Sequence, residues 1–313
     1  MLWWKRPDGT LVKKQPTVRR IMPYIMRGRN ESAVYYEYDI DLHLADKFIR
    51  EFNDAHPDTR ADIFHLWVYA VCAGLLRHPT MTRFVAGGRV YDRTSQSFAY
   101  SVKARLQHGA PLNVVKQQFP EPGDFEGLVA SMQEHTTQSR FGGPSYVDKE
   151  LGLLFRFPGF VRRIALGLVF LGNRLGLLPR SFIDKDPLFA TVFFVNLASI
   201  GMDPCYHHLY EYGTIGIFSV VGRPRLAPGS PTSGPDRRRM TTIRWSFDER
   251  VEDGLQAWAA MKLMRAITED PQAYGLTTER SAARPALATT EATTEDGDGT
   301  DGYREPVRSG GLP

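Results

Sequence analysis

The side chains best suited to chemistry gather in one short segment, CYHHLYEYG, in the second half of the chain. Cys205, His207, His208 and Glu211 supply a thiol, two imidazoles and a carboxylate. An imidazole titrates near neutral pH, so either histidine could act as a general base. Cysteine, histidine and glutamate are also zinc ligands. Adjacent histidines point to opposite faces of a strand, however, and we find no second ligand cluster. We therefore expect no metal site, and favour histidines that are hydrogen-bonded or partly exposed among tyrosines.

A second candidate is the acidic segment RWSFDERVEDG, in which a strand pattern runs into a turn that ends in glycine. Glu249 lies in this turn among three further carboxylates, Asp248, Glu252 and Asp253. A glutamate can serve as a base when burial raises its pKa, and neighbouring carboxylates act in the same direction. The alternative is a solvated or ion-paired glutamate without a catalytic role.

Predicted core elements must position both segments. Buried strands are indicated on either side of CYHHLYEYG by LFATVFFVNLASIG and GTIGIFSVVGR, and RMTTIRWSFDER indicates a strand that ends at the acidic turn. Earlier strands are predicted for AVYYEYDIDL, RFVAGGRVYD, SFAYSVKAR and APLNVVKQQF. Helices are predicted for LADKFIREFNDAHP, FEGLVASMQEHTTQSR, VEDGLQAWAAMKLMRAITEDP and the almost wholly apolar ADIFHLWVYAVCAGLLRHP, where we expect His65 to be a core residue. Because the order lacks a βαβ rhythm, we predict an α+β fold with a mixed or antiparallel sheet covered by helices.

Composition restricts the functional class. The chain has 313 residues and a net charge of +4, which suits an anionic ligand, but it shows no aromatic-plus-basic motif for nucleic acid. Two cysteines, Cys72 and Cys205, make no disulfide framework, so we expect a cytoplasmic protein, with peripheral attachment to a membrane as an alternative. We expect a polar leader over residues 1–18, a folded domain over 19–275 and a disordered tail over 276–313, where few large apolar side chains occur.

Residues 150–184 form an apolar insert punctuated by arginines. We expect helices here, and three roles fit the composition. Residues 151–179 could lie on a membrane surface with the arginines at the headgroups. They could line a pocket for a long acyl chain. They could also form a buried hairpin or a contact between copies, because so many large apolar side chains need cover.

Four segments together resemble a known family. MTTIRWSFDERVEDG is similar to the strand that ends in Asp-His-Arg-x-x-Asp-Gly in the catalytic domain of dihydrolipoyl acyltransferases of 2-oxo-acid dehydrogenase complexes, and Asp248, Arg250, Asp253 and Gly254 match it. VFFVNLASIG resembles the family strand ending in Ser-Asn-Leu-Gly, and GIFSVVGR a strand containing ILGVG. FHLWVYAVCAGLLRHPTMTRFVAGGRVY resembles the layout of its buried helix, proline turn and strand. The resemblance runs from about Arg19 to Pro271 and implies a chloramphenicol acetyltransferase-like fold.

The resemblance also implies an activity. The family transfers an acyl group between coenzyme A and the thiol of a lipoyl group, or a drug hydroxyl in the acetyltransferase branch, in a tunnel between subunits of a trimer. We therefore expect a homotrimer that uses acyl-coenzyme A as a substrate and binds no metal. The sequence shows no lipoyl domain, so we expect either a free thioester substrate or a partner that carries the lipoyl or acyl group. The alternative is a catalytically inactive relative that acts as a scaffold, a membrane-surface protein or a partner of a true acyltransferase.

The family's site positions fall on unusual residues here. Glu249 occupies the position of the catalytic histidine, and Asp253 that of a structural aspartate, whose arginine partner would be Arg19 or Arg20. The position of the oxyanion hydroxyl is Val195, which has no donor. Asn196 lies beside it in the chain. Ser199, a little further on, is a candidate replacement donor, and His207 or His208 is a candidate base in a rearranged site.

Overall fold

The computed structural model describes residues 5–103, 112–141, 152, 154–234 and 237–279. Its main sheet consists of β3 (Ala33–Asp41), β6 (Ser97–Lys103), β7 (Leu112–Gln118), β8 (Val192–Asn196), β9 (Ile217–Val221), β10 (Arg225–Leu226) and β11 (Arg239–Asp248). The spatial order is β10-β11-β9-β8-β6-β7, and β3 pairs with β11. Strands β6, β8 and β9 run parallel, whereas the other pairs are antiparallel. The predicted mixed sheet is confirmed.

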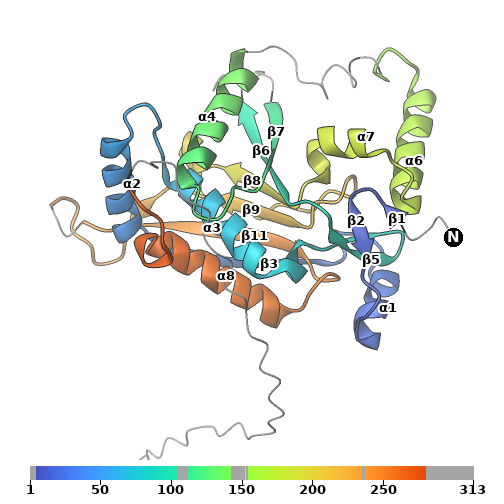
Figure 1. Ribbon diagram of the computed structural model, residues 1–313, viewed down its shortest axis with the longest axis horizontal. Coiled ribbons are helices and arrows are strands. Elements are labelled where there is room, and N and C mark those ends of the chain that lie inside the picture. Colours follow the sequence, from blue (N-terminus) through green and yellow to red (C-terminus); the bar gives the residue numbers. More distant parts are fainter. Residues whose placement is uncertain (1–4, 104–111, 142–151, 153, 235–236, 280–313) are drawn as a thin grey trace, which may run out of the picture. The chain divides into compact units, whose positions relative to one another are not determined.

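Helices cover one face of this sheet (Figure 1). The helices of the described part are α1 (Thr17–Ile25), α2 (His43–Ala55), α3 (Ile63–Arg77), α4 (Phe125–Phe141), α6 (Gly159–Leu175), α7 (Arg180–Lys185) and α8 (Gly254–Glu269). Short 3-10 turns are η1 (Pro79–Thr82), η2 (Pro187–Phe189), η3 (Ala198–Ile200) and η4 (Gln272–Tyr274). Helices α3 and α8 pack together against the sheet and enclose the largest apolar core.

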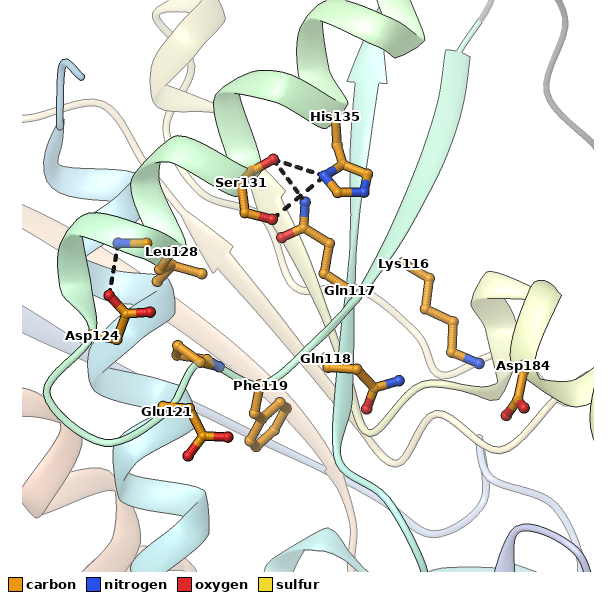
Figure 2. A pocket seen from close by; sticks show the side chains of 12 residues that line it. Lys116, Gln117, Gln118, Phe119, Glu121, Asp124, Leu128, Ser131, His135 and Asp184 are labelled. Carbon is orange, nitrogen blue, oxygen red and sulfur yellow. Dashed lines mark hydrogen bonds between the residues drawn. The ribbon is translucent and has the colours of Figure 1, made fainter. Parts of the chain in front are cut away.

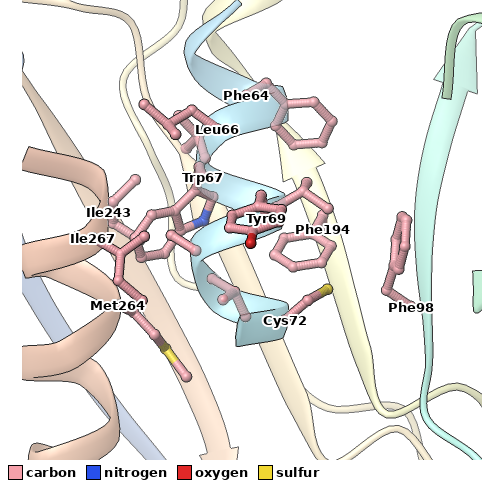
Figure 3. Close-up of a cluster of buried hydrophobic side chains, with 14 of the residues drawn as sticks. Phe64, Leu66, Trp67, Tyr69, Cys72, Phe98, Phe194, Ile243, Met264 and Ile267 are labelled. Carbon is pink, nitrogen blue, oxygen red and sulfur yellow. The ribbon is translucent and has the colours of Figure 1, made fainter. Parts of the chain in front are cut away.

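Helix α3 lies in the middle of that core, as its apolar sequence predicted (Figure 3). Trp67 packs against Trp245 of β11 with ring centroids 5.3 Å apart, and its indole N–H donates to Ser219 of β9 at 2.8 Å. One expectation is wrong: His65 is partly exposed and belongs to the helix cap. It is the third residue of α3, where its ring turns back to Asp62, whose carboxylate caps the first turn.

The segment that contains CYHHLYEYG covers the opposite face of the sheet. A smaller apolar cluster there joins Leu209 and Ile215 of this segment to Phe193 of β8 and Phe218 of β9. The polypeptide between β8 and β9 therefore packs back on the sheet without forming a strand. The prediction of buried strands on either side of it is confirmed.

A second, four-stranded sheet contains β1 (Lys5–Arg6), β2 (Gly9–Leu11), β5 (Arg89–Arg93) and β4 (Phe84–Ala86) in that spatial order. Residues 5–11, expected to belong to a polar leader, therefore lie within the fold. Arg6 is buried, pairs with Asp8 at 2.9 Å and lies over the rings of Phe84 and Tyr91. A basic residue suggested solvent exposure, but aromatic faces and a carboxylate replace the water around this guanidinium.

The described part of the apolar insert contains helix α6 and most of the short helix α7. Helix α6 ends at Gly176, whose φ of 71° closes the helix in the left-handed region, and the buried Asn173 anchors this end of the helix. None of the described helices is long and apolar enough to cross a bilayer. Of the expected tail, Leu276 packs in the main core, and residues 280–313 lie outside the described residues.

Candidate functional site

Strand β11 ends in a buried ion pair. The carboxylate of Asp248 accepts Nε and Nη2 of Arg250 at 2.8 and 2.7 Å, and both side chains are buried. Nη1 of Arg250 also donates to the carbonyls of Met26 and Arg27, each at 3.1 Å. The pair therefore fastens the end of β11 to the segment that follows α1, so both residues hold the candidate site in place.

A second buried cation, Arg29, links the segment that follows α1 to CYHHLYEYG. Its guanidinium donates to the carbonyls of Tyr210, Glu211 and Gly213 at 3.1, 2.8 and 2.8 Å. Desolvation lowers the pKa of Arg29 to about 10, an effect that Asp248 opposes. The carboxylate of Glu211 accepts the backbone N–H of Arg29 at 3.1 Å. Glu211 therefore organises a turn, and sequence reasoning missed Arg29 because no local pattern distinguishes it from an exposed arginine.

Glu249 follows the last residue of β11 and has its backbone held on both sides. Its N–H donates to the carbonyl of Ser32 at 2.9 Å, and its carbonyl accepts Nη1 of Arg19 at 2.9 Å. The side chain is half-buried. Among the described residues its carboxylate makes no hydrogen bond or ion pair, whereas Asp248 binds Arg250 and Glu252 lies 3.8 Å from Arg83. Glu249 is thus the one carboxylate of this turn that is free to accept a proton or a partner, as far as the described residues show.

Asp253 caps α8 and also pairs with α1. Its Oδ1 accepts the N–H groups of Leu255 and Gln256 at 3.1 Å, and its Oδ2 lies 3.5 Å from Nη2 of Arg19. The hydrogen bond from the N–H of Gln256 contributes most to lowering the pKa of Asp253. The partner is thus Arg19, while Arg20 is exposed and lines a groove between α1 and β5. Adjacent residues of a helix point about 100° apart, so only one of the two arginines can face the turn.

Gly254 is the first residue of α8. Within the described residues, no steric contact requires a glycine at this position. A Cβ added there would meet nothing within 4 Å. Side-chain packing therefore does not explain why this chain has the glycine of the family motif.

His207 and His208 lie on the outer face of the sheet. The ring of His207 stacks on Phe218 with centroids 4.3 Å apart and an interplanar angle of 4°, and its Nδ1 lies 2.7 Å from the carbonyl oxygen of His208. Burial is the main cause that lowers the pKa of His207, so its neutral form is favoured. His208 is exposed. Cys205 is also an exposed thiol, and the described residues contain no group of three His, Cys, Asp or Glu side chains placed to hold a metal.

The end of β8 holds the remaining expected residues. The Oδ1 of Asn196 accepts the N–H of Ser199 at 3.2 Å, and the hydroxyl of Ser199 donates to the carbonyl of Asn196 at 2.8 Å. These bonds close the η3 turn. The hydroxyl of Ser199 is therefore engaged with its own turn, and Val195 offers no donor beside it.

Sequence reasoning also missed a cavity of 440 Å³ between β7, α4 and α7 (Figure 2). Lys116 lies at one side, where its Nζ donates to the carbonyls of Ile183 and Asp186 at 2.7 and 3.2 Å. Burial is the main cause that lowers the pKa of Lys116 to about 8. On the other side, Nδ1 of His135 lies 2.8 Å from the carbonyl oxygen of Ser131. None of the residues expected from the sequence to form the site lines this cavity.

Comparisons with known proteins bear on the fold. A probable dihydrolipoamide acetyltransferase from Listeria monocytogenes superposes with a TM-score of 0.53 at 15% identity, over 82% of this chain and 94% of that chain. The Azotobacter vinelandii dihydrolipoamide acetyltransferase gives 0.55 at 14% identity, over 84% and 93%. A chloramphenicol acetyltransferase gives 0.51 at 11% identity, over 84% and 98%. The chain has the chloramphenicol acetyltransferase-like fold. No protein-family model and no curated protein matches its sequence.

In this chloramphenicol acetyltransferase-like fold, strand register separates Glu249 from Val195. Val195 of β8 is level with Val220 of β9, which in turn is level with Arg244 of β11. Glu249 lies five positions beyond Arg244 in the sequence. At about 3.4 Å per residue, the two positions are roughly 17 Å apart along the strand direction. One chain therefore does not bring the expected base position and the expected oxyanion position together.

Proposed function

We propose that this protein is an acyltransferase in which Glu249 acts as the general base. The observation that carries the proposal is the unpaired carboxylate of Glu249 on a backbone held by Ser32 and Arg19. Every other carboxylate of the acidic turn has a cationic neighbour. The fold supports the same reaction class, because its structural neighbours include dihydrolipoamide and chloramphenicol acetyltransferases.

The proposed reaction transfers an acyl group from the thioester of acyl-coenzyme A to a thiol or hydroxyl. Glu249 takes the proton of the acceptor as its sulfur or oxygen forms a bond to the thioester carbonyl carbon. The tetrahedral intermediate then collapses, the bond to the sulfur of coenzyme A breaks, and this sulfur takes the proton from Glu249. The net reaction exchanges one acyl bond for another, so it needs no oxidant or reductant.

The roles of a serine, a histidine and an asparagine in the catalytic mechanism of the Azotobacter enzyme have been investigated. A carboxylate is a weaker base than a histidine. The reference pKa is ~4.3 for a glutamate and ~6.5 for a histidine, a difference of about 3 kcal/mol in proton affinity. We therefore propose a slow acyltransferase, with turnover lower than an imidazole base would give in the same pocket.

The proposed site is shared between copies of the chain. A second copy is needed because roughly 17 Å along the strand direction separates Glu249 from Val195 within one chain. We propose a homotrimer, since structural neighbours include the cubic core of a pyruvate dehydrogenase complex and the catalytic core of a 2-oxoacid dehydrogenase complex from Thermoplasma acidophilum. The acyl acceptor is proposed to be a free thiol or hydroxyl compound, or a lipoyl-bearing partner.

The test is release of free coenzyme A from acyl-coenzyme A in the presence of dihydrolipoamide or a simple alcohol. Glu249→Gln should reduce turnover by about 100-fold or more, because a positioned base contributes typically 10²–10⁴. Glu252→Gln is the matched control, since it removes a carboxylate three positions away that pairs with Arg83, and it should leave turnover within a few fold of wild type. Wild-type turnover in the Glu249 variant would remove Glu249 from the mechanism.

A second candidate function is that of a non-catalytic relative. It is favoured by the donor-free side chain of Val195 and by the hydroxyl of Ser199, which donates to the carbonyl of Asn196. Titration calorimetry with acetyl- and longer-chain acyl-coenzyme A separates the two candidates. Micromolar binding together with turnover supports the acyltransferase, whereas the absence of binding at every chain length supports the non-catalytic relative.

A further inference from the structure

Helix α6 displays an apolar stripe that nothing in the described structure covers. Phe160, Ile164, Leu168 and Leu171 follow one another at spacings of four, four and three residues. This spacing places them on one side of the helix. Between half and two thirds of each side chain is exposed, at 65%, 59%, 63% and 50%. A monomeric protein rarely leaves such a run of large apolar side chains in contact with water.

The charge around the stripe has one sign. Between residues 151 and 183 the sequence contains five arginines and no aspartate or glutamate. Arg163 and Arg174 are exposed on α6, and Arg156 is exposed just before it. Among the described residues these three form no ion pair, whereas the exposed Arg180, Arg223 and Arg225 each pair with an aspartate. Unpaired guanidinium groups beside apolar side chains are suited to phosphate oxygens next to a hydrocarbon phase.

Within the described residues, the contacts that hold helix α6 to the rest of the fold gather near its C-terminal end. The guanidinium of Arg6 donates to the side-chain oxygen of Asn173 at 2.8 Å and also to its backbone carbonyl, and the amide of Asn173 donates to the carbonyl of Gly213 at 3.3 Å. The carbonyl of Arg174 lies so close to Gly87 that a Cβ there would approach it to 2.3 Å. These contacts hold the last turn of α6 beside the small sheet that contains β1 and β2 (Figure 1), while the four side chains of the stripe remain exposed.

We propose that α6 binds the surface of an anionic lipid bilayer, with the stripe inserted among the acyl chains and the arginines at the phosphates. The helix is amphipathic and lies within a folded protein, and no described helix can span the bilayer, so this attachment is peripheral. A symmetric contact between the α6 helices of two copies would bring arginines together, because residues 151–183 contain no acidic side chain. The proposal does not depend on catalysis by Glu249.

Vesicle flotation of the full chain tests this proposal. Vesicles of phosphatidylcholine with about one third phosphatidylglycerol should carry the protein upward, and pure phosphatidylcholine should carry much less. Raising the salt concentration should release the protein, because salt screens the attraction between arginine and phosphate. The partition coefficient should fall about fivefold for each of Arg163→Gln and Arg174→Gln, since a cation near an anionic surface contributes about 1 kcal/mol.

The stripe is tested by the double variant Ile164→Gln, Leu168→Gln, which should lose binding to vesicles by tenfold or more. Leu44→Gln, Leu76→Gln is the matched control, because these leucines are exposed on other helices at 43% and 41%, and it should float like wild type. Circular dichroism and thermal unfolding of each variant establish that the fold is kept. Wild-type flotation of the stripe variant would overturn the proposal. So would a protein that floats with neither vesicle type, or a stripe variant that changes only the oligomeric state in sedimentation.

Discussion

Substitution of the buried pair Asp248–Arg250 has a predictable and unequal effect on stability. Both side chains are almost fully buried, at 1% and 3% exposure, and Arg29 is a second buried cation close enough to interact with both. Removing one partner of a buried pair costs about 3–5 kcal/mol, because the other charge stays buried and uncompensated. Asp248→Asn leaves two guanidinium groups that repel each other. Arg250→Gln leaves a carboxylate that Arg29 still partly neutralises. We therefore expect the Asp248 variant to be the less stable of the two.

Urea unfolding followed by circular dichroism measures this order. We expect losses near 5 kcal/mol for Asp248→Asn and near 3 kcal/mol for Arg250→Gln, with a favourable coupling of about 1–3 kcal/mol in the double variant. The control is Arg223→Gln, which breaks an exposed pair with Asp203 of similar length, 2.9 Å, and should cost less than about 1 kcal/mol. The electrostatic account is refuted if Arg250→Gln is the more damaging change, or if both variants unfold like the control.

Three further predictions follow from the candidate site and the cavity. Asp253→Ala should cost about 1 kcal/mol of unfolding free energy and Asp253→Asn much less, because asparagine also caps a helix; equal losses would show that the pair with Arg19 matters more than the cap. Burial lowers the pKa of Lys116 from 10.5 to about 8, so the unfolded state binds more protons than the folded state between pH 8 and 10.5. As the pH rises through that range, the free energy of unfolding of wild type should therefore increase by about 1–3 kcal/mol relative to that of Lys116→Met. Parallel curves of unfolding free energy against pH would contradict the burial of this ammonium. Glu249→His should raise turnover about 10- to 100-fold if a stronger base is all that the site lacks, and the coenzyme A release assay measures it.

Much of the fold was predictable from local sequence. The alternation in AVYYEYDIDL predicted β3, and the apolar ADIFHLWVYAVCAGLLRHP predicted the buried helix α3, because side-chain periodicity and burial are properties of a short segment. The order of these segments, with the match around Asp248 and Gly254, was enough to predict the chloramphenicol acetyltransferase-like fold that the structural neighbours show. The hydrophobic pattern did not predict burial where a polar side chain binds partners that are distant in the sequence. Arg6 was assigned to a leader and is buried.

The sequence by itself determined which elements form and which residue types stand at the family's site positions, above all Glu249 and Val195. The tertiary structure decided which of those residues meet. It paired Arg19 rather than Arg20 with Asp253, engaged Glu211 in a turn, and kept Glu249 about 17 Å along the strand direction from Val195. The physical reason is that ion pairs and strand register depend on contacts between residues that are distant in sequence. A local pattern specifies the conformation of a segment but not its neighbours.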